Sequence, residues 1–214
     1  MNSVNIGICG VGTVGSGTIN VLHRNIKEIT ARLGCEIVVS QVGSRRDPSD
    51  CDLTGISVSH DIFSVADNPN IDILVELIGG TTVAKDLVLR AINKGKHVVT
   101  ANKALIAEFG NEIFHAAEKK GVIVAFEAAV AGGIPIVKAI REGLSANNIE
   151  WIAGIINGTS NFILTEMKDK NRDFSDVLEE AQELGYAETD PTFDIEGIDA
   201  AHKLSIMASL AFGC

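Results

Sequence analysis

The sequence predicts an α/β fold with a doubly wound parallel sheet, followed by a second, incomplete α+β domain. Short runs rich in β-branched residues alternate with helical stretches as far as residue 127, which is typical of a parallel sheet. The first run leads directly into a glycine-rich turn and then into a helix. After residue 127 the alternation stops and helical stretches predominate. We therefore expect one domain over residues 1–131 and another over residues 132–214.

The glycine-rich turn lies between the first expected strand and the first expected helix. It reads Gly-Val-Gly-Thr-Val-Gly at residues 10–15, a Gly-x-Gly-x-x-Gly pattern in the setting of a dinucleotide site. Gly10 permits the turn, Gly12 lets a pyrophosphate approach the backbone, and Gly15 lets the helix pack closely on the strand. The turn predicts a Rossmann-like cofactor domain; the alternative is a glycine-rich connection without a ligand. The residues expected to contact the dinucleotide are Gly10, Gly12, Thr13, Val14 and Gly15.

Apolar spacing and glycine punctuation define the other elements of the first domain. Strands are expected over residues 4–9, 36–42, 71–78, 97–100 and 122–127, and helices over residues 13–33, 84–94 and 105–120. Gly34 and Gly95 follow two of these helices, and glycine often ends a helix because it accepts a left-handed conformation. Residues 47–70 are polar and contain Pro48 and Pro69, so we expect a turn-rich loop there.

The second domain is expected to be mainly helical. Helices are expected over residues 136–144, 162–170, 174–184 and 198–210, with a strand over residues 151–156 and a turn over residues 157–161. Residues 185–196 are read as an acidic loop that contains Pro191. We expect this domain to bind the substrate.

The end of the second strand indicates which dinucleotide is held. An acidic residue there would bind the ribose 2′-hydroxyl of NAD, whereas arginine suits the 2′-phosphate of NADP. Gly43 and Ser44 occupy the acidic position, and Arg45 and Arg46 follow. We predict that both arginines bind the cofactor and that it is NADP, with NAD as the alternative. A solvated basic turn is the competing interpretation.

Composition excludes several classes of function. The net charge of −10 disfavours nucleic acid and anionic membranes as partners, because both attract basic surfaces. No apolar run approaches the roughly 20 residues of a membrane span, and we expect no secretory signal because the first residues carry no basic segment. Four cysteines are scattered without a Cys-x-x-Cys pair, which indicates reduced thiols. We therefore expect a cytoplasmic protein.

Four further stretches resemble the homoserine dehydrogenase family. They read Glu-Leu-Ile-Gly-Gly at residues 76–80, Val-Val-Thr-Ala-Asn-Lys-Ala-Leu at 98–105, Asn-Gly-Thr-Ser-Asn at 157–161, and Gly-Tyr-Ala-Glu-Thr-Asp-Pro at 185–191, continuing through residues 194–204. With the glycine turn they cover essentially the whole chain in the family's order. Because family members continue further, we expect a fragment: the cofactor domain and the first part of a catalytic domain, truncated at its C-terminus.

The resemblance implies catalytic and substrate-binding roles for particular residues. Lys203 is expected to be the general acid/base, and Asp199 to orient the substrate and the lysine. Glu188 is expected to bind the α-ammonium group of the substrate, with Asp194 and Lys103 as further substrate contacts. A nearby ammonium can stabilise a developing alkoxide and donate a proton to it, so the lysine suits this role.

Each of these residues also has a simpler interpretation. On spacing alone, Asp199 and Lys203, four residues apart on one helix face, are an exposed ion pair worth about 0.3–0.5 kcal/mol. Glu188 is one of several loop carboxylates. Lys103 could be a surface lysine, although a cation is disfavoured at the start of a helix.

The resemblance also implies cofactor and cation contacts. Gly79, Lys103 and Gly185 are expected to lie against the cofactor. The resemblance further implies a site for a monovalent cation, with Na⁺ as the expected ion. The residues of this site are Glu127, Val130, Gly132 and Ile134. The alternative interpretation of these residues is an ordinary domain-joining loop.

The function implied by the resemblance is the reversible, NADP-preferring reduction of L-aspartate 4-semialdehyde to L-homoserine. This reaction belongs to the biosynthesis of threonine, methionine and isoleucine, and the resemblance suggests a homodimer or higher homo-oligomer. Two rivals stay open. One is a Rossmann dehydrogenase acting on a related carbonyl, for instance through a nucleophilic cysteine, and the other is a truncated nucleotide-binding module without activity.

Overall fold

The computed structural model describes residues 3–46 and 50–214 and divides the chain into two compact units, Met1–Gly132 and Gly133–Cys214. Pro48, expected to punctuate a loop, lies outside the described residues. The roles expected for two domains divided after residue 131 stay predictions.

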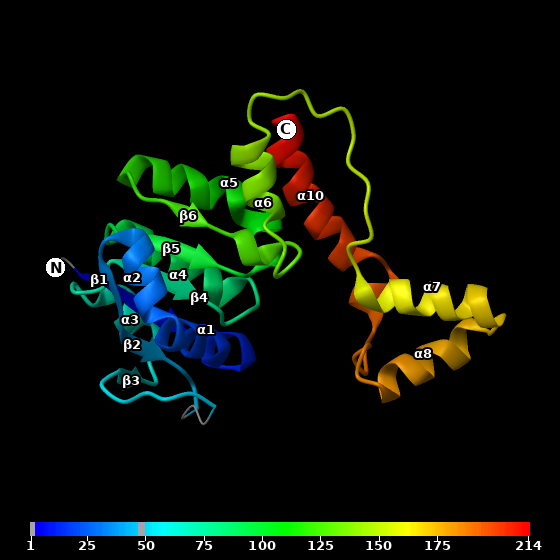
Figure 1. Cartoon of the computed structure of the whole chain (residues 1–214), viewed down its shortest axis with the longest axis horizontal. Coiled ribbons are helices and arrows are strands. Elements are labelled where there is room, and N and C mark those ends of the chain that lie inside the picture. The colour runs from blue at the N-terminus through cyan, green and yellow to red at the C-terminus, as the bar shows by residue number, and fades with distance from the viewer. Residues whose placement is uncertain (1–2, 47–49) are drawn as a thin grey trace. The chain divides into compact units, whose positions relative to one another are not determined.

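The first unit is an α/β unit whose described strands form a parallel six-stranded sheet in the order β3-β2-β1-β4-β5-β6 (Figure 1). A Rossmann-like doubly wound parallel sheet is therefore confirmed. Its strands are β1 (Ser3–Cys9), β2 (Glu36–Gly43), β3 (Ser57–Ser59), β4 (Ile73–Glu76), β5 (His97–Thr100) and β6 (Val124–Ala125). Its helices are α1 (Thr13–Arg24), α2 (Ile26–Leu33), α3 (Ile62–Asp67), α4 (Thr82–Asn93), α5 (Lys103–Lys120) and the 3₁₀ turn η1 (Glu127–Ala129).

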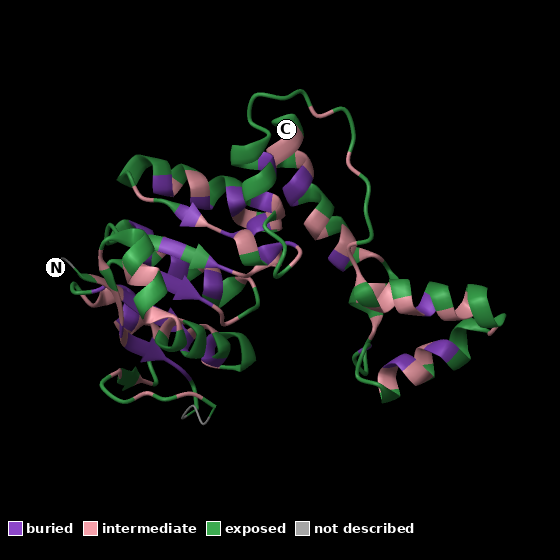
Figure 2. Ribbon diagram, viewed as in Figure 1, coloured by how far each residue is buried: buried purple, intermediate pink, exposed green. Residues whose placement is uncertain are grey.

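Strand β1 shows how helices cover both faces of the sheet. Ile6 and Ile8 pack in one cluster with Ile19 of α1. The alternate residues face the other way: a Cβ at Gly7 would meet Val65 of α3, and the Cys9 thiol donates to the carbonyl oxygen of Ile62. This alternation follows from the two-residue period of a strand. Figure 2 shows buried residues concentrated in these central strands.

The carboxyl ends of four strands form one row. Cys9 of β1 is in register with Gly43 of β2 and Glu76 of β4, and Glu76 is in register with Thr100 of β5. The chain leaves β1 towards β2 but leaves β4 towards β5, so β1 and β4 flank the point where the winding reverses. Ligands of open α/β sheets bind at this edge, outside such a switch point.

Some local expectations for the first unit are corrected. The helix expected over residues 13–33 is interrupted at Asn25, which has φ −108° and ψ 18° and divides α1 from α2. The turn-rich loop expected over residues 47–70 contains β3 and α3. The last expected strand is shortened to β6 and followed by η1. Gly34 does end α2 in a left-handed conformation, with φ 72°.

The described part of the second unit contains helices and no strand. Its elements are α6 (Ile136–Lys138), the π-helical turn η2 (Ala139–Gly143), α7 (Gly158–Lys170), α8 (Phe174–Glu183), α9 (Thr192–Ile195) and α10 (Ile198–Phe212). Helices α7 and α8 pack through Ile163, Val177 and Ala181. The turn expected over residues 157–161 is wrong because α7 already begins at Gly158, and the acidic loop contains α9.

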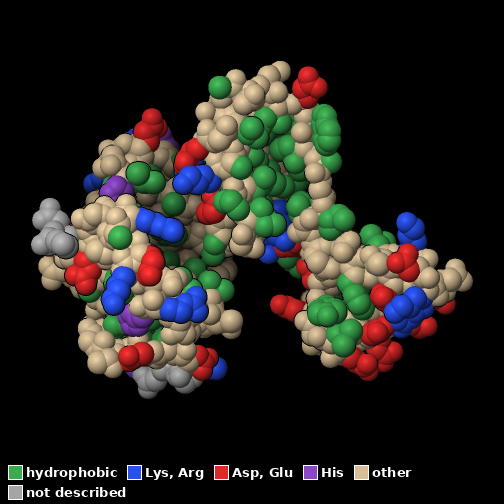
Figure 3. Space-filling model, in the orientation of Figure 1, with side chains coloured by type: hydrophobic (Ala, Val, Ile, Leu, Met, Phe, Trp, Pro, Cys, Tyr) green, Lys and Arg blue, Asp and Glu red, His purple; other side chains and the backbone are tan. Residues whose placement is uncertain are grey.

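The strand expected over residues 151–156 is also wrong. The segment has no regular secondary structure and is not part of the described sheet. A strand needs a neighbour for its backbone hydrogen bonds, and all the described strands pair within the sheet of the first unit. The side chains of Trp151 and Ile155 are 73% and 78% exposed. Figure 3 shows that hydrophobic side chains also appear on the surface elsewhere.

Among the described helices, none combines the length and the apolar character that crossing a bilayer requires.

Candidate functional site

The glycine turn is held at the carboxyl edge of the sheet by backbone contacts. The N–H of Gly10 donates to the carbonyl oxygen of Gly43 at 2.8 Å. Gly10 has φ +94°, and a Cβ there would lie 2.4 Å from the carbonyl oxygen of Leu77. A Cβ at Gly15 would lie 2.1 Å from the carbonyl oxygen of Gly10. Both positions therefore require glycine, as the motif predicts.

The middle glycine is open in the way that a phosphate site requires. Gly12 is exposed and no atom lies within 4 Å of the Cβ that it lacks. It is the N-cap of α1, and no side chain caps the helix there. The helix start therefore offers backbone N–H groups and a partial positive charge to an anion. The turn, with Thr13 and Val14 exposed beside it, fits a dinucleotide pyrophosphate.

The end of β2 places the two predicted arginines next to this turn. Ser44 is buried, and its N–H donates to the carbonyl oxygen of Ser59 at 2.9 Å. Arg45 and Arg46 follow it and are both exposed. Gly43 accepts a hydrogen bond from Gly10 of the glycine turn, so Arg45 and Arg46 lie two and three residues after a residue that contacts the turn. No carboxylate occupies residues 43–46, so this strand end lacks an acidic partner for a ribose hydroxyl.

The loops after β4 and β5 bring two more predicted residues to the same edge. Gly79 is exposed with φ +72°, and Lys103 is the first residue of α5. The side chain of Asn102 caps α5 by accepting from the N–H of Leu105 at 3.1 Å, and it donates to the carbonyl oxygen of Gly80 at 2.6 Å. The two loops are thus joined directly.

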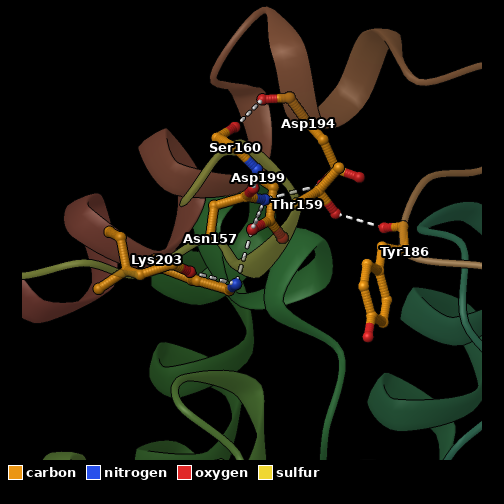
Figure 4. Close-up of polar contacts among 8 residues, drawn as sticks. Asn157, Thr159, Ser160, Tyr186, Asp194, Asp199 and Lys203 are labelled. Carbon is orange, nitrogen blue, oxygen red and sulfur yellow. Dashed lines mark hydrogen bonds and ion pairs between the residues drawn. The ribbon is translucent and has the colours of Figure 1, made fainter. Parts of the chain in front are cut away.

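In the second unit, a polar cluster forms around the predicted catalytic pair (Figure 4). The Nζ atom of Lys203 donates to Oδ2 of Asp199 at 2.6 Å and to the carbonyl oxygen of Ile156 at 2.7 Å. The side chains of Lys203 and Asp199 are 19% and 5% exposed. Such a partly buried pair differs from the exposed surface pair that its spacing alone suggests.

Asn157 joins this cluster to the third predicted carboxylate. Its Nδ2 atom donates to Oδ1 of Asp194 at 2.8 Å and to Oδ2 of Asp199 at 2.9 Å, while its Oδ1 caps α7 by accepting from the N–H of Ser160. Asp199 therefore accepts from both Asn157 and Lys203 through one oxygen. Asp199 also lies in the first turn of α10, where the helix dipole favours a negative charge.

This arrangement can deliver a proton. The lysine ammonium is held by one carboxylate and one carbonyl and keeps partial exposure to solvent. A substrate oxygen placed beside Nζ could accept a hydrogen bond, since an ammonium has three donors. Figure 4 shows these side chains converging from the start of α7 and from α10.

Asn157 and the carbonyl oxygen of Ile156 were missed as individual site residues by sequence reasoning. Asn157 has a local signal, because asparagine before a helix is a preferred N-cap. That signal indicates a cap and gives no sign of its contacts with Asp194 and Asp199. The carbonyl contact has no sequence signal at all.

Two other predicted residues of this unit lie outside the cluster's hydrogen bonds. Glu188 is exposed, and its carbonyl oxygen accepts from Gln182 at 3.0 Å. Gly185 is exposed with φ +74° and follows α8. The structure therefore brings Lys203, Asp199 and Asp194 together without placing Glu188 or Gly185 among them. Their roles stay predictions.

The predicted cation set is divided by the boundary between the units. Glu127 begins η1, Val130 is buried, and Gly132 ends the first unit, whereas Ile134 belongs to the second. In the described part of the chain, no cluster of three or more His, Cys, Asp or Glu side chains could hold a metal. That finding does not test a shell of carbonyl oxygens, so the site stays a prediction.

Two family models match the chain. Residues 10–127 match the model described as the NAD binding domain of homoserine dehydrogenase, and residues 135–214 match the model described as homoserine dehydrogenase. A homoserine dehydrogenase of Pseudomonas aeruginosa is 68% identical over 213 residues, which are 100% of this chain and 49% of that protein. One from Neisseria gonorrhoeae is 58% identical, again over 100% of this chain and 49% of that protein.

Solved structures show the same relationship. A homoserine dehydrogenase from Thiobacillus denitrificans superimposes with a TM-score of 0.92 at 60% identity, covering 99% of this chain and 49% of that one. A hyperthermophilic archaeal homoserine dehydrogenase in complex with NADPH has a TM-score of 0.86 at 30% identity, covering 100% of this chain and 71% of that one. The chain spans about half the length of the curated relatives it matches. These matches, together with the glycine turn and the polar cluster around Lys203, show that the chain belongs to the homoserine dehydrogenase family.

Proposed function

We propose that this chain carries the cofactor domain and the proton-donating group of a homoserine dehydrogenase that reduces L-aspartate 4-semialdehyde to L-homoserine. The observation that carries the proposal is the Lys203 ammonium, bonded to Asp199 and to the carbonyl oxygen of Ile156 in a partly buried position. When bound, NADPH would supply the hydride for this reduction. The glycine turn would hold its pyrophosphate.

The residues of the chain divide the remaining tasks. As the aldehyde oxygen gains negative charge, Lys203 stabilises it and donates a proton to it. Asp199 and Asn157 fix the position of the lysine. Glu188 would bind the substrate's α-ammonium group through a charge-assisted hydrogen bond, with Asp194 and Lys103 as further contacts. Gly79, Lys103 and Gly185 would lie against the cofactor.

The test is an NADPH-oxidation assay with L-aspartate 4-semialdehyde, run beside an NADPH-binding titration. The proteins are this chain and a chimera in which it replaces the matching half of the Pseudomonas aeruginosa relative. We expect the chimera to oxidise NADPH only when the aldehyde is present, because the family's remaining sequence is then supplied. A chimera that binds NADPH but never oxidises it would support the nucleotide-binding module instead.

The structure disfavours a dehydrogenase that forms a thioester through the cysteine nearest the glycine turn. Cys9 is fully buried, and its thiol donates to the carbonyl oxygen of Ile62. Burial raises the pKa of Cys9 to about 12, and the carboxylates of Glu76 and Asp61 contribute to the same shift. A nucleophilic cysteine must be an accessible thiolate at neutral pH, and Cys9 is neither accessible nor ionised.

The preference for NADP is a separate proposal that rests on Arg45 and Arg46. Replacing both by alanine is expected to raise the Kd for NADPH by about tenfold to a hundredfold, as the loss of a charge-assisted phosphate contact implies. The Kd for NADH should change by less than about twofold, because NADH lacks the 2′-phosphate. Fluorescence titration with both nucleotides measures this, and equal losses would contradict the preference. Replacing Arg32, an exposed arginine of α2, is the control.

The remaining proposals concern the whole protein. The family suggests a homodimer or higher homo-oligomer and a place in the biosynthesis of threonine, methionine and isoleucine, and the scattered cysteines suggest a cytoplasmic location. It also suggests a monovalent cation such as Na⁺ at Glu127, Val130, Gly132 and Ile134. One carboxylate with several carbonyl oxygens is a reasonable shell for such a hard cation.

A further inference from the structure

A fully buried carboxylate lies at the end of β4, among the loops of the carboxyl edge. Glu76 is 0% exposed. Its Oε1 atom accepts from the backbone N–H groups of Ile78 and Gly79 at 2.9 and 3.3 Å, and its Oε2 atom accepts from the hydroxyl of Thr100 at 2.5 Å. Buried carboxylates are uncommon unless they are paired or hydrogen-bonded, and Glu76 accepts from the loop after β4 and from the last residue of β5.

The hydrogen bonds continue beyond Thr100 to the start of α5. Thr100 is 1% exposed, and its Oγ1 atom accepts from the N–H of Asn102 at 3.0 Å. The side chain of Asn102 then caps α5 and donates to the carbonyl oxygen of Gly80. The path therefore starts in the loop at residues 78–80, passes through Glu76 and Thr100, and returns to that loop. These hydrogen bonds hold the backbone at residues 78–80 and at residues 100–102, next to the predicted cofactor contacts Gly79 and Lys103.

We propose that Glu76 is a positioning residue for the nicotinamide half of the cofactor. In this fold the end of β2 binds the ribose of the adenosine half of the cofactor. The nicotinamide half therefore lies on the other side of the switch point, beside β4 and β5. The loop at residues 78–80 and the turn at residues 100–102 form the edge on that side. This inference rests on the proposed function, because it names the part of the bound cofactor that the two loops meet.

The geometry requires a carboxylate at this position. Glutamine in the same place has one acceptor oxygen and one donor group. If the amide group faced Ile78 and Gly79, donors would oppose donors. If it faced Thr100, the threonine hydroxyl would lose its acceptor while buried. Either orientation leaves a buried donor without a partner, and the loops are expected to separate locally.

The first measurement is amide hydrogen exchange and requires no cofactor. In Glu76→Gln we expect the N–H groups of Ile78, Gly79 and Asn102 to exchange about tenfold faster or more, since each loses an acceptor or its support. Thr100→Val should give the same result at Asn102, whereas Thr100→Ser should resemble the wild type. Unchanged protection of these amides in Glu76→Gln would overturn the proposal.

The second measurement compares two ligands on the folded chain. For Glu76→Gln we expect the Kd for NADPH to rise about tenfold, while the Kd for 2′-phospho-ADP-ribose, which lacks nicotinamide, changes by less than about twofold. If Glu76 had a purely structural role, its replacement would weaken the binding of both ligands or of neither, and either result would refute the proposal. Circular dichroism confirms that the variants are folded.

The matched control removes a carboxylate charge just before the opposite end of the same strand. Asp72 precedes β4, and its Oδ2 atom accepts from the N–H of Asn5 at 2.8 Å. Asp72→Asn should change neither the ratio of the two affinities nor the exchange at residues 78–79. A wild-type chain that binds neither ligand would refute the proposed cofactor and with it the role of Glu76 towards nicotinamide, whereas unchanged amide exchange in Glu76→Gln would refute the support that Glu76 gives the loop at residues 78–80 and leave the cofactor proposal standing.

Discussion

Replacing Lys203 by alanine is expected to lower kcat for the reduction of L-aspartate 4-semialdehyde by about a hundredfold to ten-thousandfold, the range over which a positioned general acid acts. The methyl side chain cannot donate a proton or stabilise the alkoxide. The Kd for NADPH should change by less than about twofold, because the lysine is assigned to the reacting oxygen and not to the cofactor. Steady-state kinetics in the chimera and a binding titration measure the two quantities.

Two further variants separate the functions of Lys203. Arginine keeps the positive charge but holds its proton too tightly to act as an acid, so Lys203→Arg should also lose most of the turnover. Lys170 provides a matched control, because it pairs with Glu166 at the same spacing and at 2.6 Å, but with 60% exposure. Lys170→Ala should leave kcat unchanged, and near-normal turnover in Lys203→Ala would remove the lysine from the mechanism.

Replacing Gly10 by alanine is expected to lower the free energy of unfolding by about 3 kcal/mol or more, since a strained backbone angle and a steric clash combine. The new Cβ would lie 2.4 Å from a carbonyl oxygen at φ +94°. The atoms nearest to this Cβ belong to the backbone of Leu77 and Ile78, so no side chain can rotate away to make room. Chemical denaturation followed by circular dichroism measures the loss, and wild-type stability would contradict the geometry of the turn.

Two other glycines distinguish folding from ligand binding. At Gly12 and Gly17 no atom lies within 4 Å of the missing Cβ. Gly12→Ala should therefore fold normally but raise the Kd for NADPH by at least about tenfold, because its methyl group occupies the path of the pyrophosphate. Gly17→Ala, in the middle of α1, should bind NADPH normally and gain about 0.5–1 kcal/mol of stability. Loss of binding in Gly17→Ala would show that the assay reports damage to the helix.

Elements with strong local signals could be predicted from the sequence, and elements that depend on neighbours could not. The strand at residues 97–100 and the glycine turn are encoded by short-range patterns. Helix α3 was missed although Asp61 caps it by accepting from the N–H of Phe63, because a polar loop surrounds it. The strand expected over residues 151–156 has the right residue types, but whether such a segment pairs is decided by tertiary structure.

The candidate site was predicted residue by residue only where a family motif names the residue. Lys203 and Asp199 are one turn apart, so their pairing follows from helix geometry. Their partial burial does not follow from helix geometry, because it depends on distant partners. Ile156 lies 47 residues from Lys203 along the chain, and Asn157 lies 42 residues from Asp199. Glu76 was noticed only as part of a motif. Two of its three hydrogen bonds come from Ile78 and Gly79 in the loop that directly follows it, and the third, from Thr100, depends on the pairing of β4 with β5.

The environment of Cys9 has a consequence for oxidative damage. Peroxides and disulfides react with thiolates, and burial raises the pKa of the Cys9 thiol to about 12, so that it stays protonated at pH 7. The sulfur that precedes the phosphate-binding turn is therefore protected twice, by its protonation and by its burial. An oxidant would reach the exposed Cys214 first. The cofactor turn keeps its shape in surroundings that would modify an ordinary cysteine at the same place.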